Sequence, residues 1–242
     1  MAGIFISKGM TVTIPAGGLK ISLGPDGPSI PSVTLHVHFD VCPTWCELAM
    51  THLASANSHE AARVLAWQGT DENEKAKSLE REFESSMQAV MAAAIAIDAF
   101  YAVVRGHVQI PPELVDKWRV RRTARYSQVT EVLRRGFHLK PKGTKALRDN
   151  LKEIYRFRDM AVHPSGRIQA ALLHPDLDVG VEWRFVYFRA ANARALVNAA
   201  TGIVWQLAHH GKPTTAKVVN YIDGLRARLG TLFPSGHPAS RS

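Results

Sequence analysis

The chain has 242 residues, 46% of them hydrophobic, so it is long enough to bury a substantial core. Its net charge is +9 at neutral pH, which favours a negatively charged partner. Two cysteines are too few for a disulfide-stabilised secreted domain, and the first ten residues lack the pattern of a secretory signal peptide, so we expect a reducing, cytoplasmic setting.

Residues 1–46 predict a small β-rich extension. They contain the short β-type segments GIFI, MTVTIP, GLKISL and VTLHVHFDV, separated by the turn-forming stretches KG, PAGG and GPDGPSIPS. We expect two to four strands or hairpins from this pattern.

Residues 47–232 predict a helical domain, and residues 233–242 a loose tail. The apolar run 89–104 contains one acid and is shorter than the about 20 residues that cross a bilayer, so we expect a buried core helix and no membrane contact. Caps and periodicity predict helices over 47–67, 74–105 (capped by Asp71 or Asn73), 123–138, 144–163, 191–210 and 214–229, and a strand over 181–189.

Positive charge is concentrated in one segment. Between Lys117 and Arg148 there are eleven Lys or Arg residues and one acid, Glu131, which gives a net charge of +10. The rest of the chain therefore sums to −1. This distribution favours a surface that binds a polyanion, and the alternative is a solvated face without a partner.

Two charges fall on helical faces that should be apolar. Asp98 lies in the apolar run, and Arg158 continues the face that begins with Leu147, Leu151 and Ile154. A buried charge is unfavourable unless it is paired. We therefore predict an ion pair between Asp98 and Arg158.

The motif RDMAVHP at 158–164 resembles the R-x4-6-H motif of the HEPN domain family, found in many prokaryotic toxins and defence proteins. The upstream segment AIDAFYAVV resembles the other helix of that family, which carries an acid before an aromatic residue. The resemblance covers roughly residues 74–210. It implies a mainly α, HEPN-like helical bundle that dimerises and cleaves RNA without a metal or other cofactor.

The resemblance also implies roles for individual residues. His163 would be the general acid or base, Arg158 would bind the phosphate, Asp98 would orient Arg158, and Asp159 would support the site. The RNA backbone would lie on the basic segment, with the candidate residues Lys117, Arg119, Arg121, Arg122, Arg125, Arg134 and Arg135.

Two alternatives stay open. The chain could be a non-catalytic HEPN-like module that binds nucleic acid or a protein, with Arg158 and His163 in structural roles. If it is a toxin, an antitoxin or other regulatory partner is expected. Separately, metal-ligand types occur at His36, His38, Asp40, Cys42 and Cys46, but no ligand set with metal-site spacing follows them. We assign no metal here, and whether His36, His38 and Cys42 bind one stays open.

Overall fold

The computed structural model describes residues 5–7, 9–25, 27–163 and 168–238. The protein is mainly α-helical with a small N-terminal β region, as predicted. It divides into two compact units, Met1–Val41 and Cys42–Ser242. The helical unit begins earlier than the predicted residue 47, because Cys42 and Cys46 are both fully buried in the first turns of its first helix.

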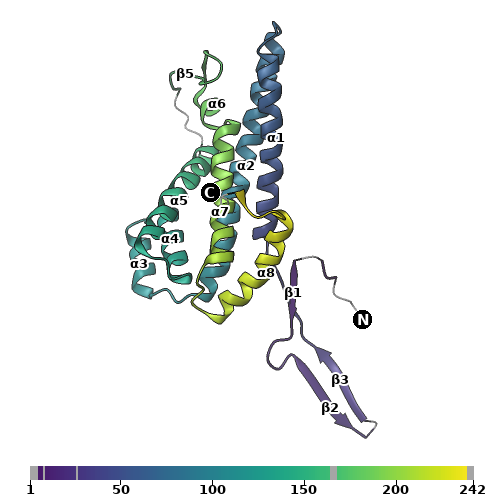
Figure 1. Ribbon diagram of the computed structural model, residues 1–242. Coiled ribbons are helices and arrows are strands. Elements are labelled where there is room, and N and C mark those ends of the chain that lie inside the picture. The colour runs from purple at the N-terminus through teal and green to yellow at the C-terminus, as the bar shows by residue number, and fades with distance from the viewer. Residues whose placement is uncertain (1–4, 8, 26, 164–167, 239–242) are drawn as a thin grey trace. The chain divides into compact units, whose positions relative to one another are not determined.

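In the N-terminal unit, strand β1 (Met10–Thr13) pairs antiparallel with β4 (His36–Phe39), and β2 (Leu19–Gly24) pairs with β3 (Gly27–Val33) (Figure 1). Strand β3 falls on the stretch predicted as a turn. Gly27 adopts a φ of +103°, which allows the tight reversal between β2 and β3. The other predicted segment, GIFI, lies partly outside the described residues.

Helices α1 (Cys42–Ala66) and α2 (Glu72–His107) lie side by side and form the longest pair of the second unit (Figure 1). Asp71 caps α2 as predicted, because its side chain accepts hydrogen bonds from the backbone N–H groups of Asn73 and Glu74. By length and composition α2 could cross a membrane, but 56% of its most apolar window is buried inside the protein. Its apolar side chains form the centre of the bundle core.

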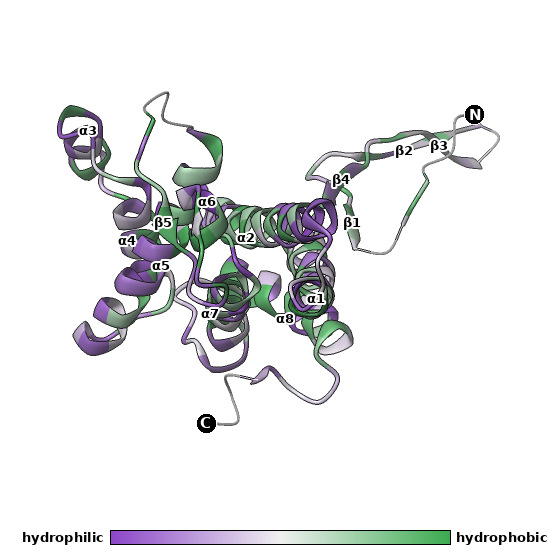
Figure 2. Ribbon diagram, turned by 90° about the horizontal axis from the view of Figure 1, so that it is seen from above, coloured by the Kyte–Doolittle hydropathy of each residue, from purple (hydrophilic) through white to green (hydrophobic). Residues whose placement is uncertain are grey.

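Helices α3 (Pro112–Val120), α4 (Arg125–Gly136) and α5 (Pro141–Val162) lie together on one side of the long helices (Figure 2). Helix α3 is not predicted by the sequence analysis. Helix α5 begins before the predicted cap Thr144, because Pro141 occupies its first turn, where a missing N–H does no harm. Both α4 and α5 pack on α2.

The remaining elements complete the bundle. Strands β5 (Leu172–Leu173) and β6 (Gly180–Val181) pair, and helix α6 (Trp183–Tyr187) replaces most of the strand predicted over 181–189. The side chain of Glu182 accepts the N–H of Arg184 and starts that helix. Helix α7 (Ala190–His210) packs on α1, α2 and α5, and α8 (Ala216–Leu232) packs on α7.

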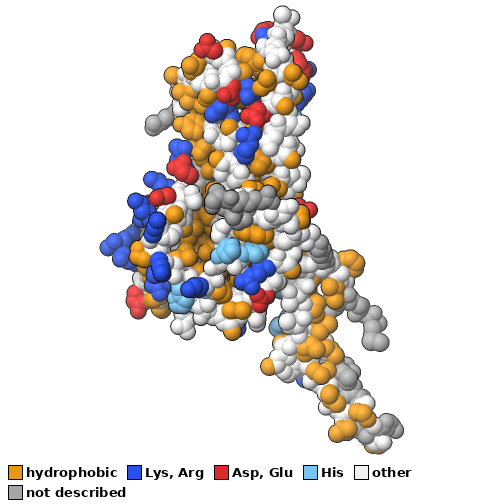
Figure 3. Space-filling view, viewed as in Figure 1, with side chains coloured by type: hydrophobic (Ala, Val, Ile, Leu, Met, Phe, Trp, Pro, Cys, Tyr) orange, Lys and Arg blue, Asp and Glu red, His pale blue; other side chains and the backbone are white. Residues whose placement is uncertain are grey.

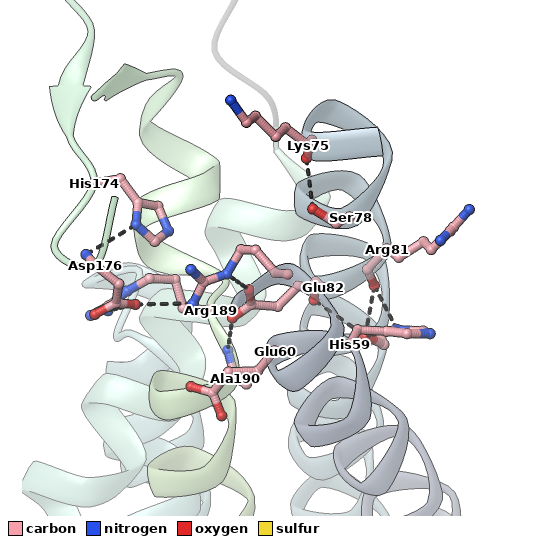
Figure 4. A network of polar contacts seen from close by, with 12 residues as sticks. His59, Glu60, Lys75, Ser78, Arg81, Glu82, His174, Asp176, Arg189 and Ala190 are labelled. Carbon is pink, nitrogen blue, oxygen red and sulfur yellow. Dashed lines mark hydrogen bonds and ion pairs between the residues drawn. The ribbon is translucent and has the colours of Figure 1, made fainter. Parts of the chain in front are cut away.

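A polar network joins α1, α2, the β5–β6 loop and the start of α7 (Figure 4). The buried Arg63 donates to the buried Glu82, which also accepts the N–H of Ala190 at 2.9 Å. Arg63 and Arg189 both contact Asp176, at 3.2 and 3.0 Å. The sequence analysis does not predict this network, although it ties segments that are far apart in the chain.

We expect Glu82→Ala to lower the free energy of unfolding by about 3–5 kcal/mol, because it leaves Arg63 buried without its main counter-ion. Urea denaturation measures this change. The matched control is Glu72→Ala, which removes the exposed partner of Lys75 (2.7 Å) and should change stability by less than about 1 kcal/mol. Equal, small effects of both substitutions would contradict a stabilising role of the buried pair.

His174 makes this region sensitive to acid. Burial, with the nearby positive charge of Arg63, lowers the pKa of His174 from 6.5 to about 4. The unfolded chain therefore binds more protons than the folded chain between these values, and stability should fall as the pH drops from 6.5 to 4. We expect His174→Gln to flatten this part of a plot of unfolding free energy against pH. An unchanged slope in the variant would show that His174 is not the titrating group.

Candidate functional site

Asp98, on α2, is held by side chains from two other helices. Its Oδ1 accepts hydrogen bonds from Nε of Arg125 and from the hydroxyl of Tyr155, each at 2.8 Å. Nη2 of Arg125 lies 2.7 Å from the same oxygen. The predicted ion pair with Arg158 is therefore wrong. Arg125 stands at the first position of α4, where that helix packs on α2, and it takes the place predicted for Arg158.

The two side chains that donate to Asp98 have raised pKa values. Burial and the adjacent carboxylate of Asp98 raise the pKa of the Tyr155 hydroxyl far above its usual value, so this phenol donates a hydrogen bond and cannot act as a base. Burial lowers the pKa of Arg125, but the hydrogen bond to Asp98 and its negative charge outweigh burial and raise it. The contacts of Asp98 therefore join α2, α4 and α5 at this point.

Two further residues of α2 extend the cluster. The guanidinium of Arg125 lies 4.2 Å from the ring centroid of Tyr101, within the range of a cation–π interaction. The hydroxyl of Tyr101 accepts a hydrogen bond from Nη1 of Arg105 at 3.0 Å. The sequence analysis did not select Tyr101, Arg105 or Tyr155. The spacing of Asp98, Tyr101 and Arg105 on one helical face was the available signal.

Arg158, Asp159 and His163 lie at the end of α5. The guanidinium of Arg158 is 5.8 Å from the ring centroid of Tyr155, and its Nη1 is 3.7 Å from Oδ1 of Asp159. Its side chain is 34% exposed, so it can still reach a ligand. His163 is exposed and caps the C-terminus of α5. Its backbone N–H donates to the carbonyl of Asp159 at 2.9 Å. Pro164, the last residue of the motif, lies outside the described residues.

This helix end carries groups suited to phosphate chemistry. Arg158 presents a planar set of donors that matches phosphate oxygens. The imidazole of an exposed histidine can accept and release a proton near neutral pH. Tyr155 links this end to Asp98, so the contact predicted between Asp98 and Arg158 is replaced by an indirect one through the tyrosine.

Only some of the predicted RNA-binding residues are without an acidic partner in the part of the chain that the structure describes. Lys117, Arg121 and Arg122 are exposed and form no ion pair within the described residues. Arg119 is exposed and lies 3.6 Å from Asp116. Lysine and arginine side chains gather on the face that contains α3, α4 and α5 (Figure 3).

Three of the predicted RNA-binding arginines form ion pairs with carboxylates of the protein itself. Arg125 pairs with Asp98, and Arg134 and Arg135 both donate to Glu131, at 2.7 and 2.6 Å. Hydrogen bonds from Arg134 lower the pKa of Glu131, so the carboxylate stays charged. These three arginines stabilise α4 and contribute less free positive charge than the sequence suggests.

The residues considered for a metal differ in exposure. Cys42 and Cys46 are buried in α1, while His36 and His38 are exposed on β4. Among the described residues, no group of three or more His, Cys, Asp or Glu side chains is arranged to hold a metal ion.

Comparison with known proteins gives no assignment: no family model, curated protein or solved structure matches this chain. The resemblance to the HEPN family therefore stays a hypothesis from the sequence, carried by residues 158–164 and the segment AIDAFYAVV.

A double-mutant cycle can test which arginine balances Asp98. We expect Asp98→Ala and Arg125→Ala to be non-additive, with a coupling of about 1 kcal/mol or more in urea denaturation. The same cycle with Arg158→Ala is the control and should give less than about 0.5 kcal/mol. Stronger coupling of Asp98 with Arg158 than with Arg125 would overturn the pairing described above.

Proposed function

We propose that the protein is a metal-independent endoribonuclease of the HEPN type, which acts as a dimer on RNA in the cytoplasm. The observation that carries this proposal is the grouping of Arg158, Asp159 and His163 at the accessible end of α5, a helix that also borders the basic face. An anionic, flexible substrate suits this arrangement of charge.

The proposed reaction uses the 2′-hydroxyl of RNA. That oxygen attacks the adjacent phosphorus, the bond to the 5′-oxygen of the next nucleotide breaks, and the products are a 2′,3′-cyclic phosphate and a 5′-hydroxyl. His163 takes the proton of the 2′-hydroxyl or returns one to the leaving 5′-oxygen. Arg158 stabilises the negative charge that builds on the non-bridging oxygens.

A dimer fits this chemistry because one step needs both a base and an acid. Each chain supplies one His163, so two chains that face one another at the end of α5 would supply both groups. Asp98 acts as a positioning residue in this scheme: it holds Tyr155, whose ring lies beside Arg158. A toxin or defence role, with an antitoxin or another regulatory partner, follows from the proposed activity.

The competing function is a non-catalytic module that binds nucleic acid or a protein. It is favoured by one observation: Asp98 is committed to Arg125, so Arg158 lacks the buried carboxylate that would orient it directly. In this case Arg158 and His163 would serve to end α5, and the basic face alone would bind a partner.

We expect the purified protein to cleave single-stranded RNA in the presence of EDTA and to leave 2′,3′-cyclic phosphate ends. His163→Ala and Arg158→Ala should each lower the cleavage rate by about 100-fold or more, as for loss of a general acid or a phosphate ligand. Gel analysis of a labelled RNA measures the rate.

The control is Arg81→Ala, which removes an exposed arginine of α2 that pairs with Glu74 at 3.2 Å and lies outside the motif. It should leave cleavage near the unmodified rate. RNA binding without cleavage by the unmodified protein would favour the module over the enzyme.

A further inference from the structure

A cavity of about 670 Å³ opens between α4 and α5, away from Arg158 and His163. The volume falls in the range of small-molecule sites. The α5 residues that line the cavity recur at intervals of three or four positions: Thr144, Lys145, Arg148, Asp149 and Lys152. These positions lie on the side of the helix next to the apolar face that packs into the core.

The charge in this cavity is positive and available. Lys145, Arg148 and Lys152 form no ion pair within the described residues, so their charges are not neutralised. Arg134 also lines the cavity but is held by Glu131. Three free cations around one concave surface are typical of a site for a phosphate group.

The cavity lining also includes aromatic and apolar side chains. Tyr126 comes from α4, Leu139 from the segment after it and Pro141 from the first turn of α5, and the guanidinium of Arg148 lies 5.8 Å from the ring centroid of Tyr126. A hydrogen bond with Arg148 lowers the pKa of the Tyr126 hydroxyl. A tyrosine ring next to an arginine plane gives a surface on which a nucleobase stacks.

One acid, Asp149, lines the cavity among these cations and has no ion pair within the described residues. A carboxylate repels phosphate, but it accepts hydrogen bonds from sugar hydroxyls. Acidic side chains hold the ribose of bound nucleotides in this way. The cavity therefore offers separate partners for all three parts of a nucleotide.

We propose that this cavity binds a ribonucleoside 5′-phosphate, with the base on Tyr126, the ribose hydroxyls on Asp149 and the phosphate on Lys145, Arg148 and Lys152. The nucleotide is either free or the 5′ end of an RNA strand, since the two share this chemistry. The proposal does not require cleavage by His163. If the strand end is the ligand, α5 connects the two sites, because Arg148 and Arg158 are about 15 Å apart along the helix axis.

The test is calorimetric titration of the full chain with AMP at about 0.15 M ionic strength, where weak surface electrostatics are screened. We expect saturable binding of AMP. We expect adenosine and inorganic phosphate to bind at least about tenfold more weakly, since each lacks part of the recognised structure. The deoxyribonucleotide dAMP should also bind more weakly. No binding of AMP below about 1 mM would overturn the proposal.

Matched variants show whether binding occurs in the cavity. Lys145→Gln with Arg148→Gln should weaken AMP binding by about tenfold or more. The control, Lys140→Gln with Lys142→Gln, removes the same charge from exposed positions at the start of α5 that do not line the cavity. Equal weakening by both pairs would mean non-specific attraction and would overturn the site. All of these side chains are exposed, and thermal unfolding of each variant confirms that the fold is intact.

Two further results decide the ligand in more detail. Asp149→Asn should reduce the difference between AMP and dAMP, and equal binding of the two by the unmodified protein would overturn the assignment of the ribose. Displacement of AMP by a short RNA with a 5′-phosphate, but not by the same RNA with a 5′-hydroxyl, identifies a strand end, and displacement by neither identifies a free nucleotide. A protein that binds AMP but cleaves no RNA would retain this site and lose only the proposed enzymatic function.

Discussion

The organisation of the helical unit depends on the burial of α2 with a carboxylate inside its apolar stretch. Helix α2 contacts α1, α4, α5, α6, α7 and α8, so its position fixes theirs. Asp98 interrupts the run of alanine and aliphatic residues and has to be paired. Its partners, Arg125 and Tyr155, come from the first position of α4 and the middle of α5. One partly buried charge on α2 therefore aligns the two helices that carry most of the candidate functional residues.

This alignment gives α5 two faces with different tasks. Leu147, Leu151 and Ile154 are buried against the core and fix the rotation of the helix about its axis. The adjacent face then carries Arg148 and its neighbours toward α4, and the same face leads to Asp159 near the C-terminal end. The cavity and the Arg158–His163 end are consequences of one helix orientation, although they are chemically independent of each other.

The sequence predicted what local patterns determine. The cap at Asp71, the core helix that follows it and the helix that ends at His210 depend on periodicity and terminal residues, and they are present. The requirement of a partner for Asp98 was also predictable, but the identity of the partner was not. Arg125 stands among many cations in the sequence and was predicted to bind RNA, and only the packing of α4 on α2 brings it to Asp98. The pair of Arg63 and Glu82 was not predicted, because neither residue interrupts an apolar pattern in the sequence.

Ion pairs within the protein also reduce the positive charge that the basic segment 117–148 can offer to a partner. Its net charge of +10 was counted along the chain, but Arg125, Arg134 and Arg135 are paired within the protein. The charge left for a partner is concentrated on α3 and on the cavity face of α5. A bound strand would gain most where cations are unpaired and next to an aromatic ring, because there the attraction of phosphate adds to base stacking. The cavity beside Tyr126 satisfies both conditions. The pairing of Arg125, Arg134 and Arg135 within the protein therefore makes this cavity the part of the basic segment best suited to bind a nucleotide.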